Sequence, residues 1–439
     1  MIAPARVAAY EVLRAVRTGR TDLGSALARH RKALKDERDR ALAGEIAIGT
    51  LRWQGAFDHV ISAFANRPLK KFDAEVLDVL RLTIFQILHL ERIPVSAAVK
   101  DAVDLTGKVG KRSAAGLVNA ILRRVSRERE RLPLPPRPSD PSDRTAAVAY
   151  LSVTLSHPAW LVSRWLDRYG FENAESWARF NNSPAPLTLR ANTLKVDRDE
   201  LASRLRDEGI ECERTTRARD GLIARSGNPL SSALHDQGFF VVQDEASQLV
   251  GSFANARPGE TVLDACASPG GKTLAMAAGM KGNGLIVASD VRPRRVHLLR
   301  ETIARSGASN IVIVQADVTT PLPFGRVFDR VLLDAPCSGL GTVRRDPDIK
   351  WRRQEAELPA LAAAQLRMLE TVAAVVKPGG VIVYSTCSSE PEENDEVVDG
   401  FTSRHPEFTV EGDLLRPLPF RDGLEAFFAA MLVSARHLR

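Results

Sequence analysis

The chain has 439 residues, of which 44% are hydrophobic and 26% are charged. This composition is typical of a soluble globular protein, and it argues against a disordered, collagenous or coiled-coil chain. No apolar run of 18 residues lacks a charge, and the first residues soon meet an acid, so we expect neither a transmembrane helix nor a signal peptide. The four scattered cysteines form no CxxC or Cys/His cluster, which predicts reduced thiols in the cytoplasm and no zinc site.

The charge is unevenly distributed along the chain. The net charge of +7 comes from 61 basic and 54 acidic residues. Residues 1–130 hold 24 of the basic and 15 of the acidic residues, so the whole positive excess lies in the N-terminal third. A basic module joined to a nearly neutral body suits a polyanionic partner, although a solvated basic surface would have the same composition.

The N-terminal third has the pattern of an all-helical bundle. Ala9, Val12, Leu13 and Val16 follow the helical spacing of an apolar stripe, and residues 77–90 are nearly all apolar, as in a central bundle helix. We therefore predict a helical domain over residues 1–131. The prolines that follow favour an extended linker over residues 132–149.

Residues 150–240 are typical of a small α+β module. Residues 187–194 and 211–215 have strand patterns, and residues 199–208 have that of a helix. Ser156 is placed to cap another helix, with Pro158 in its first turn. The pair Phe239 and Phe240 fits a buried core better than a platform for stacking bases.

The last segment, residues 241–439, alternates strands and helices. The alternation predicts an α/β domain with a doubly wound, Rossmann-like parallel sheet. In such sheets, ligands bind at the C-terminal ends of the strands. The expected strands are residues 261–265, 285–289, 311–315, 330–333 and 381–385, and the main helices are residues 293–305 and 354–376.

The first of these strands ends in a glycine turn. Gly270 and Gly271 let the backbone approach a ligand closely. A phosphate-binding P-loop is excluded because Cys266 stands where that motif needs glycine, and the absence of a complete GxGxxG disfavours NAD. Asp290 ends the second strand, where an acid accepts hydrogen bonds from ribose hydroxyls, and Asp317 ends the third.

Acids at three consecutive strand ends suit a cationic nucleoside cofactor, S-adenosylmethionine (SAM), better than a polyphosphate. Asp317 is placed to meet the adenine amino group. The alternative is that each acid merely caps the helix that follows it.

Two cysteines follow the fourth and fifth strands, and their thiols should face the same crevice. Cys337 lies just after Asp334, and Cys387 follows the last strand. A thiolate that adds to the 6-carbon of cytosine makes the 5-carbon nucleophilic. Such chemistry needs a nucleophile, an acid that holds the N3/amino edge of the ring and a base that removes the 5-proton. The pattern leaves open which thiol is the nucleophile.

Two neighbouring segments have less definite interpretations. Residues 344–351 combine arginines with Trp351, which fits contact with a phosphate backbone or a splayed base, but also a loop held by Arg–Asp pairs. Residues 390–394 are typical of a helix start, and we assign them no chemistry.

At these residues the chain resembles the Sun/RsmB-like family of RNA cytosine-5 methyltransferases. The resemblance rests on residues 265–272, 334–342, 344–351 and 385–388, in this order. Residues 1–130, above all 116–124, resemble the helical RNA-binding domain of NusB. That fusion is characteristic of the bacterial enzyme that methylates small-subunit ribosomal RNA.

The resemblance implies a role for each site residue. Cys387 would be the nucleophile, and Cys337 would assist release as the base or beside it. Asp334 would bind the edge of the cytosine, and Lys272 would lie near the methyl-transfer site. The SAM-binding residues would be Cys266, Ala267, Ser268, Pro269, Gly270, Gly271, Lys272, Asp290, Arg295, Asp317 and Asp334.

The sequence therefore predicts a cytoplasmic, monomeric SAM-dependent methyltransferase that acts on a cytosine of small-subunit ribosomal RNA and needs no metal. Two alternatives stay open. One is the same chemistry on another RNA, such as tRNA, and the other is a non-catalytic ribosome-assembly factor.

Overall fold

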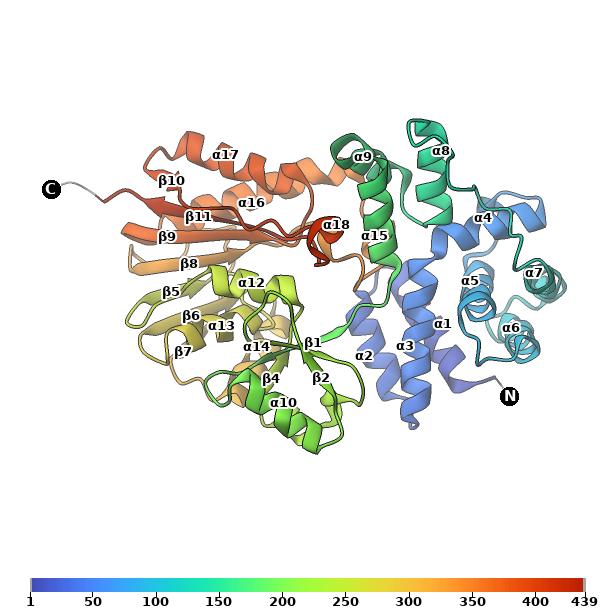
Figure 1. The fold of residues 1–439 in the computed structure, drawn as a ribbon, viewed down its shortest axis with the longest axis horizontal. Coiled ribbons are helices and arrows are strands. Elements are labelled where there is room, and N and C mark those ends of the chain that lie inside the picture. The colour runs from blue at the N-terminus through green and yellow to red at the C-terminus, as the bar shows by residue number, and fades with distance from the viewer. Residues whose placement is uncertain (1, 437–439) are drawn as a thin grey trace. The chain divides into compact units, whose positions relative to one another are not determined.

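A computed structural model describes residues 2–436 of the chain (Figure 1). The chain forms two compact units, Met1–Pro184 with Val343–Glu355, and Ala185–Thr342 with Ala356–Arg439. Within the described part of the chain, no helix is long and apolar enough to cross a membrane. The candidate catalytic residues all belong to the second unit.

The N-terminal part of the first unit is helical, as predicted. Val79, Leu80 and Ile84 of the fifth helix have no exposed surface, which makes this helix the centre of the bundle core. The helices are α1 (Pro4–Arg17), α2 (Leu23–Lys32), α3 (Glu37–Arg52), α4 (Gln54–Ala65), α5 (Ala74–His89), α6 (Val95–Lys108) and α7 (Ala115–Arg127).

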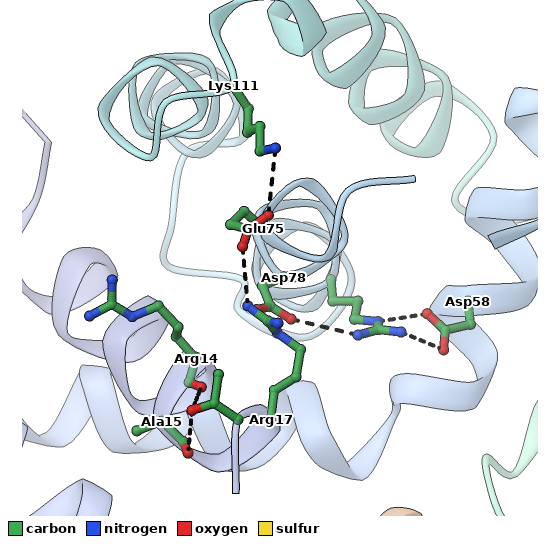
Figure 2. Close-up of polar contacts among 9 residues, drawn as sticks. Arg14, Ala15, Arg17, Asp58, Glu75, Asp78 and Lys111 are labelled. Carbon is green, nitrogen blue, oxygen red and sulfur yellow. Dashed lines mark hydrogen bonds and ion pairs between the residues drawn. The ribbon is translucent and has the colours of Figure 1, made fainter. Parts of the chain in front are cut away.

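Part of the basic charge of this bundle is used internally. Figure 2 shows Arg17 of α1 reaching toward Glu75 and Asp78 of α5. The Nε of Arg17 donates to Asp78 at 2.8 Å, and Arg81 donates twice to Asp58 of α4, at 2.6 and 2.8 Å. These arginines hold helices together, so an RNA surface has to come from other basic residues.

The proline-rich stretch ends earlier than predicted. Asp143 accepts a hydrogen bond from the N–H of Ala146 and so caps a short helix, α8 (Arg144–Ala149). The next long helix, α9 (Ala159–Asn182), begins after Pro158. The prediction that Ser156 caps this helix is wrong, because the Ser156 hydroxyl accepts instead from the N–H of Gly55, at 2.9 Å.

The segment Val343–Glu355 leaves the second unit and packs into the first. It contains the short helix α15 (Ile349–Arg352). Lys350 is fully buried and its Nζ donates to the Arg52 carbonyl at 2.9 Å, while Trp351 Nε1 donates to the Leu51 carbonyl at 2.6 Å. Of the two interpretations of residues 344–351, these contacts favour the structural one.

The second unit begins with a small antiparallel sheet. Its strand order is β2-β3-β1-β4, and its core contains Leu189, Leu201, Leu205 and Phe240. Phe240 is 2% exposed, so its role in the core is confirmed. The elements are β1 (Leu187–Ala191), α10 (Arg198–Asp207), β2 (Cys212–Arg214), β3 (Gly221–Ala224) and β4 (Phe240–Val242).

The remaining strands form a seven-stranded mixed sheet with the order β10-β11-β9-β8-β5-β6-β7. All five predicted strands are present, and they are parallel to one another. The predicted helix over residues 354–376 ends at Ala373, because β9 begins at Val376. The strands are β5 (Thr261–Asp264), β6 (Leu285–Asp290), β7 (Ile311–Gln315), β8 (Phe328–Asp334), β9 (Val376–Thr386), β10 (Phe408–Val410) and β11 (Phe428–Ser434).

Alternate side chains of the parallel strands point into two different cores. Leu263, Val331 and Leu333 pack with α16 (Leu358–Ala373) and α17 (Asp395–Arg404). Their neighbours Val262 and Leu332 pack with α12 (Glu245–Phe253) and α13 (Gly271–Gly279). The sheet therefore has helices on both faces (Figure 1), as the predicted α/β class requires.

Candidate active site

Two thiols meet at the C-terminal ends of neighbouring strands. Asp334 ends β8 and lies in register with Ser385 of β9, so the residues that follow both strands come together. The Sγ atoms of Cys337 and Cys387 are 3.3 Å apart, within hydrogen-bond distance. The expectation that both thiols face one crevice therefore agrees with the geometry.

The surroundings of Cys337 disfavour its ionised form. The hydrogen bond to Cys387, together with burial, raises the pKa of Cys337 well above its ordinary value. Either sulfur atom can be the donor of this hydrogen bond, so the geometry leaves the choice of nucleophile open.

A partly buried ion pair lies beside the thiols. Lys272 Nζ is 2.6 Å from Asp334 Oδ2, and Ser385 Oγ donates to the other oxygen of Asp334 at 2.9 Å. Burial disfavours the ammonium of Lys272, but Asp334 more than compensates, so the pKa of Lys272 lies above its ordinary value. The site therefore holds a fixed positive charge and an oriented carboxylate.

The loops that carry the two cysteines are tied together through their backbones. Gly341 N donates to the Cys387 carbonyl at 2.9 Å, and Ala426 N donates to the Gly341 carbonyl at 3.0 Å. A Cβ at Gly341 would lie 1.9 Å from the Ala426 oxygen, so no side chain fits at this position.

The glycine turn after β5 connects the thiol site to the candidate cofactor site. Gly270 has a φ of 106°, and a Cβ at Gly271 would come within 3.2 Å of the Gln243 side chain. Below the turn, burial raises the pKa of Asp264 to about 7, although the Thr273 hydroxyl donates to it. The hydrogen bond from Thr273 to Asp264 anchors the turn, and the glycines leave its backbone without side chains toward a ligand.

The residues of this turn fit a bound cofactor. Ser268 Oγ is buried and has no hydrogen-bond partner in the structure, which leaves it for a ligand. Asp290 is 5% exposed. The side chain of Arg295 contacts both Asp290 and the turn, with its Nε 3.6 Å from Asp290 Oδ2 and its Nη2 3.4 Å from the Ser268 carbonyl oxygen. An acid, an unpaired hydroxyl and a bare glycine turn are what a ribose and an amino-acid chain require.

One of the expected cofactor residues, Asp317, has other surroundings. Asp317 is exposed, and its Oδ1 accepts from the N–H and the hydroxyl of Thr319, so it caps its own turn. This contact favours the capping alternative for Asp317. Burial strongly raises the pKa of the Cys266 thiol, so Cys266 is a poor nucleophile and contributes backbone to the turn.

Glu393, for which the sequence predicts no chemical role, lies beside both cysteine loops in the structure. This carboxylate has no exposed surface, and it contacts Ser338 and Ser388, the residues that follow Cys337 and Cys387. A signal for it existed, because each cysteine is followed by serine. It was missed because residues 390–394 have the ordinary composition of a helix start.

Known families match nearly the whole chain. The 16S rRNA methyltransferase RsmB/F model matches residues 252–433, the NusB family model residues 3–127, and the RsmF/B-like ferredoxin-like domain residues 157–231. The ferredoxin-like match covers the start of the small antiparallel sheet. The three matches agree with the predicted helical, α+β and Rossmann-like parts.

Relatives and solved structures also match over most of their length. Ribosomal RNA small subunit methyltransferase B of Pseudomonas putida is 35% identical and aligns with 98% of both chains. A Bacillus subtilis relative, named "Probable ribosomal RNA small subunit methyltransferase B", is 38% identical over 87% of this chain and 84% of its own. The crystal structure of PH0851 superimposes with a TM-score of 0.82 at 27% identity, covering 98% of this chain and 99% of that one.

The fold and the site thus define the class of the protein as a methyltransferase with a Rossmann-like catalytic domain. Within that class, the chain belongs to the family of ribosomal RNA small subunit methyltransferase B.

Proposed function

We propose that the protein transfers a methyl group from SAM to the 5-carbon of a cytosine in small-subunit ribosomal RNA, through a covalent adduct with Cys387. The observation that carries the proposal is the pair of thiols 3.3 Å apart beside the Lys272–Asp334 ion pair. The names of the relatives supply the RNA, and the glycine turn with its unpaired Ser268 hydroxyl supports the cofactor.

Each residue has one task in the proposed reaction. Asp334 accepts a hydrogen bond from the cytosine 4-amino group and so holds the ring. The Cys387 thiolate adds to the 6-carbon, and the electron pair of the double bond moves to the 5-carbon, which becomes the nucleophile. SAM, when bound, supplies the methyl group on a positively charged sulfur. Lys272 stays charged and holds the Asp334 side chain in place through their ion pair.

Release reverses the addition. Cys337, whose thiol form is favoured by its surroundings, supports the base that takes the proton from the 5-carbon. The electrons of the broken C–H bond restore the double bond of the ring, and the C–S bond breaks with return of the thiolate to Cys387. The two thiols therefore divide the work between attack and release.

The direct test is Cys387→Ala. We expect no detectable 5-methylcytidine in small-subunit ribosomal RNA treated with this variant, measured by mass spectrometry of digested nucleosides. SAM affinity, measured by calorimetry, should stay within a few-fold because Cys387 is not in the glycine turn. Retained methyl transfer by this variant would exclude Cys387 as the nucleophile. If the wild type methylated tRNA but not ribosomal RNA, the proposed substrate would be wrong.

A further inference from the structure

Glu393 is a buried carboxylate that connects the two cysteine loops. Its Oε1 accepts from Ser338 N at 2.8 Å and from Gln365 Nε2 at 2.9 Å. Its Oε2 accepts from Ser338 Oγ at 2.5 Å and from Ser388 Oγ. Both serines follow a cysteine directly, so one side chain is bonded to both loops.

The surroundings of Glu393 fix it in place. The Tyr384 hydroxyl donates to the Glu393 carbonyl at 2.6 Å, and the side chain of Asn394 bonds to Thr386 and to the Ser388 carbonyl. Among the described residues, no basic side chain lies within ion-pair distance of Glu393. Hydrogen bonds alone therefore hold this buried carboxyl group, and burying it is costly unless its oxygens are all used as acceptors.

We propose that Glu393 is a positioning residue that sets the distance between the Cys337 and Cys387 thiols. A carboxylate fits because it only accepts, and each oxygen serves two donors. Replacement by glutamine turns one oxygen into a donor facing the serine hydroxyls. The loops then lose the common anchor, and the two sulfur atoms drift apart. This proposal rests on the proposed function for its effect on catalysis, but not for its geometry.

The test compares Glu393→Gln with Glu396→Gln, a control on the exposed face of α17. Diamide oxidation of the full chain measures how fast a Cys337–Cys387 disulfide forms, and this rate does not depend on methyl transfer. We expect Glu393→Gln to slow cross-linking and to lower kcat by about 10- to 100-fold, with SAM affinity and the KM for RNA nearly unchanged. Glu393→Asp can still accept from one serine, so its rate of cross-linking and its kcat should lie between those of the wild type and Glu393→Gln.

Two results would overturn the proposal. One is a Glu393→Gln variant that cross-links and turns over within two-fold of the wild type, roughly the scatter of such assays. The other is a parallel loss of SAM binding, which would make Glu393 a general folding residue. If Cys387→Ala kept activity while Glu393→Gln still slowed cross-linking, the proposed function would fail and the positioning role would stand.

A second observation concerns a cavity of about 670 Å³ in the same unit, remote from the cysteines in sequence. Arg190 of β1 lines it and is 5% exposed, and its Nε has no hydrogen-bond partner. Burial lowers the pKa of Arg190 to about 10, so the guanidinium remains charged at neutral pH. Asp220 is the acid that favours the charged guanidinium, but a buried N–H without an acceptor is unfavourable, and an anionic ligand would relieve it.

Other groups around this cavity indicate which anion it takes. Arg217, Arg219 and Lys281 also line it, with one acid, Asp220, and Arg217 is itself paired with Asp422 at 3.0 Å. Gln248 is 2% exposed, and its Oε1 is a second buried atom without a partner. The cavity thus offers cations to a phosphate and an acceptor to a hydroxyl, the pair of groups that a ribonucleotide presents.

We infer that this cavity binds one ribose-phosphate unit of the RNA substrate. The inference rests on the proposed RNA substrate but not on the methylation chemistry, so binding is measured without SAM. The probes are a single-stranded fragment of small-subunit ribosomal RNA, the DNA of the same sequence, and inorganic phosphate.

Arg190→Met separates a ligand site from a structural role. The variant should melt no lower than the wild type, because it removes a buried charge whose Nε lacks an acceptor, yet it should bind RNA at least about five-fold more weakly. Gln248→Met should reduce the preference for RNA over DNA, and the surface variant Arg225→Met should change neither.

A lower melting temperature with unchanged RNA affinity would make Arg190 a structural residue and overturn the inference. Stabilisation by inorganic phosphate without any effect of Arg190→Met on RNA affinity would reassign the cavity to small anions, and would overturn it as well.

Discussion

Lys272 and Lys350 have opposite pKa shifts because their neighbouring groups differ. Lys272 stays charged because Asp334 lies 2.6 Å away, whereas Lys350 is fully buried and donates to the Arg52 carbonyl. Burial lowers the pKa of Lys350 well below its ordinary value. The first lysine serves an ionic site, whereas the second ties α15 to the end of α3 by a hydrogen bond.

His157 gives a residue-scale prediction about pH. It is 1% exposed, and burial, helped by nearby Lys350, lowers its pKa well below the ordinary value. The unfolded chain takes up a proton below about pH 6.5 and the folded chain does not, so this contribution to stability is complete above that pH and is lost as the pH falls. His157→Gln should lose less stability on acidification than the wild type.

Urea unfolding of both chains at about pH 7.5 and 5.5 measures this difference. Tryptophan fluorescence is a suitable probe because Trp165 lies 5.4 Å from the His157 ring. The wild type should lose up to about 1.4 kcal/mol more than the variant per pH unit below 6.5. Equal losses in the two chains would contradict the assignment.

At the scale of elements, the loop after β8 packs closely against the backbone of Ala426 at Gly341. Gly341→Ala would push a methyl group into the Ala426 carbonyl, and we expect at least about 2 kcal/mol of lost stability, because buried backbone cannot move aside cheaply. Gly400→Ala in α17 is the matched control. Its Cβ would meet only Leu366, at 3.8 Å, so it should stabilise by about 0.5–1 kcal/mol.

Chemical denaturation of the two variants checks this prediction. The Gly341 variant should also lose methyl transfer, because its loop carries Cys337 and bonds to Cys387. A Gly341→Ala variant as stable and as active as the wild type would show that the loop can move without harm.

The same scale shows what the sequence could predict. The parallel strands are predictable because short β-branched runs alternate with helical patterns. Ligands bind at the C-terminal ends of such strands, and this places Cys337, Cys387, Asp334 and the glycine turn in one candidate site. Glu393 was missed, because a buried acid and a helix-starting acid look alike in sequence. The predicted Ser156 cap is wrong because the Ser156 hydroxyl accepts from Gly55, about a hundred residues away in the chain.

At the scale of the whole molecule, residues 343–355 could not be placed from sequence. In the sequence they lie between β8 and β9 of the second unit, yet Trp351 and Lys350 donate hydrogen bonds to backbone carbonyls at the end of α3. Their arginines and tryptophan looked suited to RNA, but Arg344 donates to the Pro184 carbonyl and stacks on Phe180 instead. Only the tertiary fold distinguishes the two uses.

The distribution of free basic residues gives a prediction for RNA binding. A groove of about 720 Å³ between α6 and α7 is lined by Lys100, Arg123 and Arg127, whereas Arg17 and Arg81 are paired internally. Replacing the three groove residues with glutamine should weaken RNA binding and flatten its salt dependence by roughly 2 to 3 units of log–log slope. Titrations at several salt concentrations measure this slope.

The matched control replaces three exposed basic residues at another place in the same unit, Lys32, Lys35 and Arg38. If both triple variants changed the slope equally, the RNA would be bound by general charge and not by the groove.

The central claim is that Cys387 forms a covalent bond to a cytosine of small-subunit ribosomal RNA. Covalent trapping tests it most directly. Cys337→Ala removes the thiol assigned to release, so this variant, mixed with SAM and the RNA, should give a shifted protein–RNA band on a denaturing gel. The band should disappear in the Cys337→Ala/Cys387→Ala double variant. A band that persists in the double variant, or no band with any RNA, would contradict the claim.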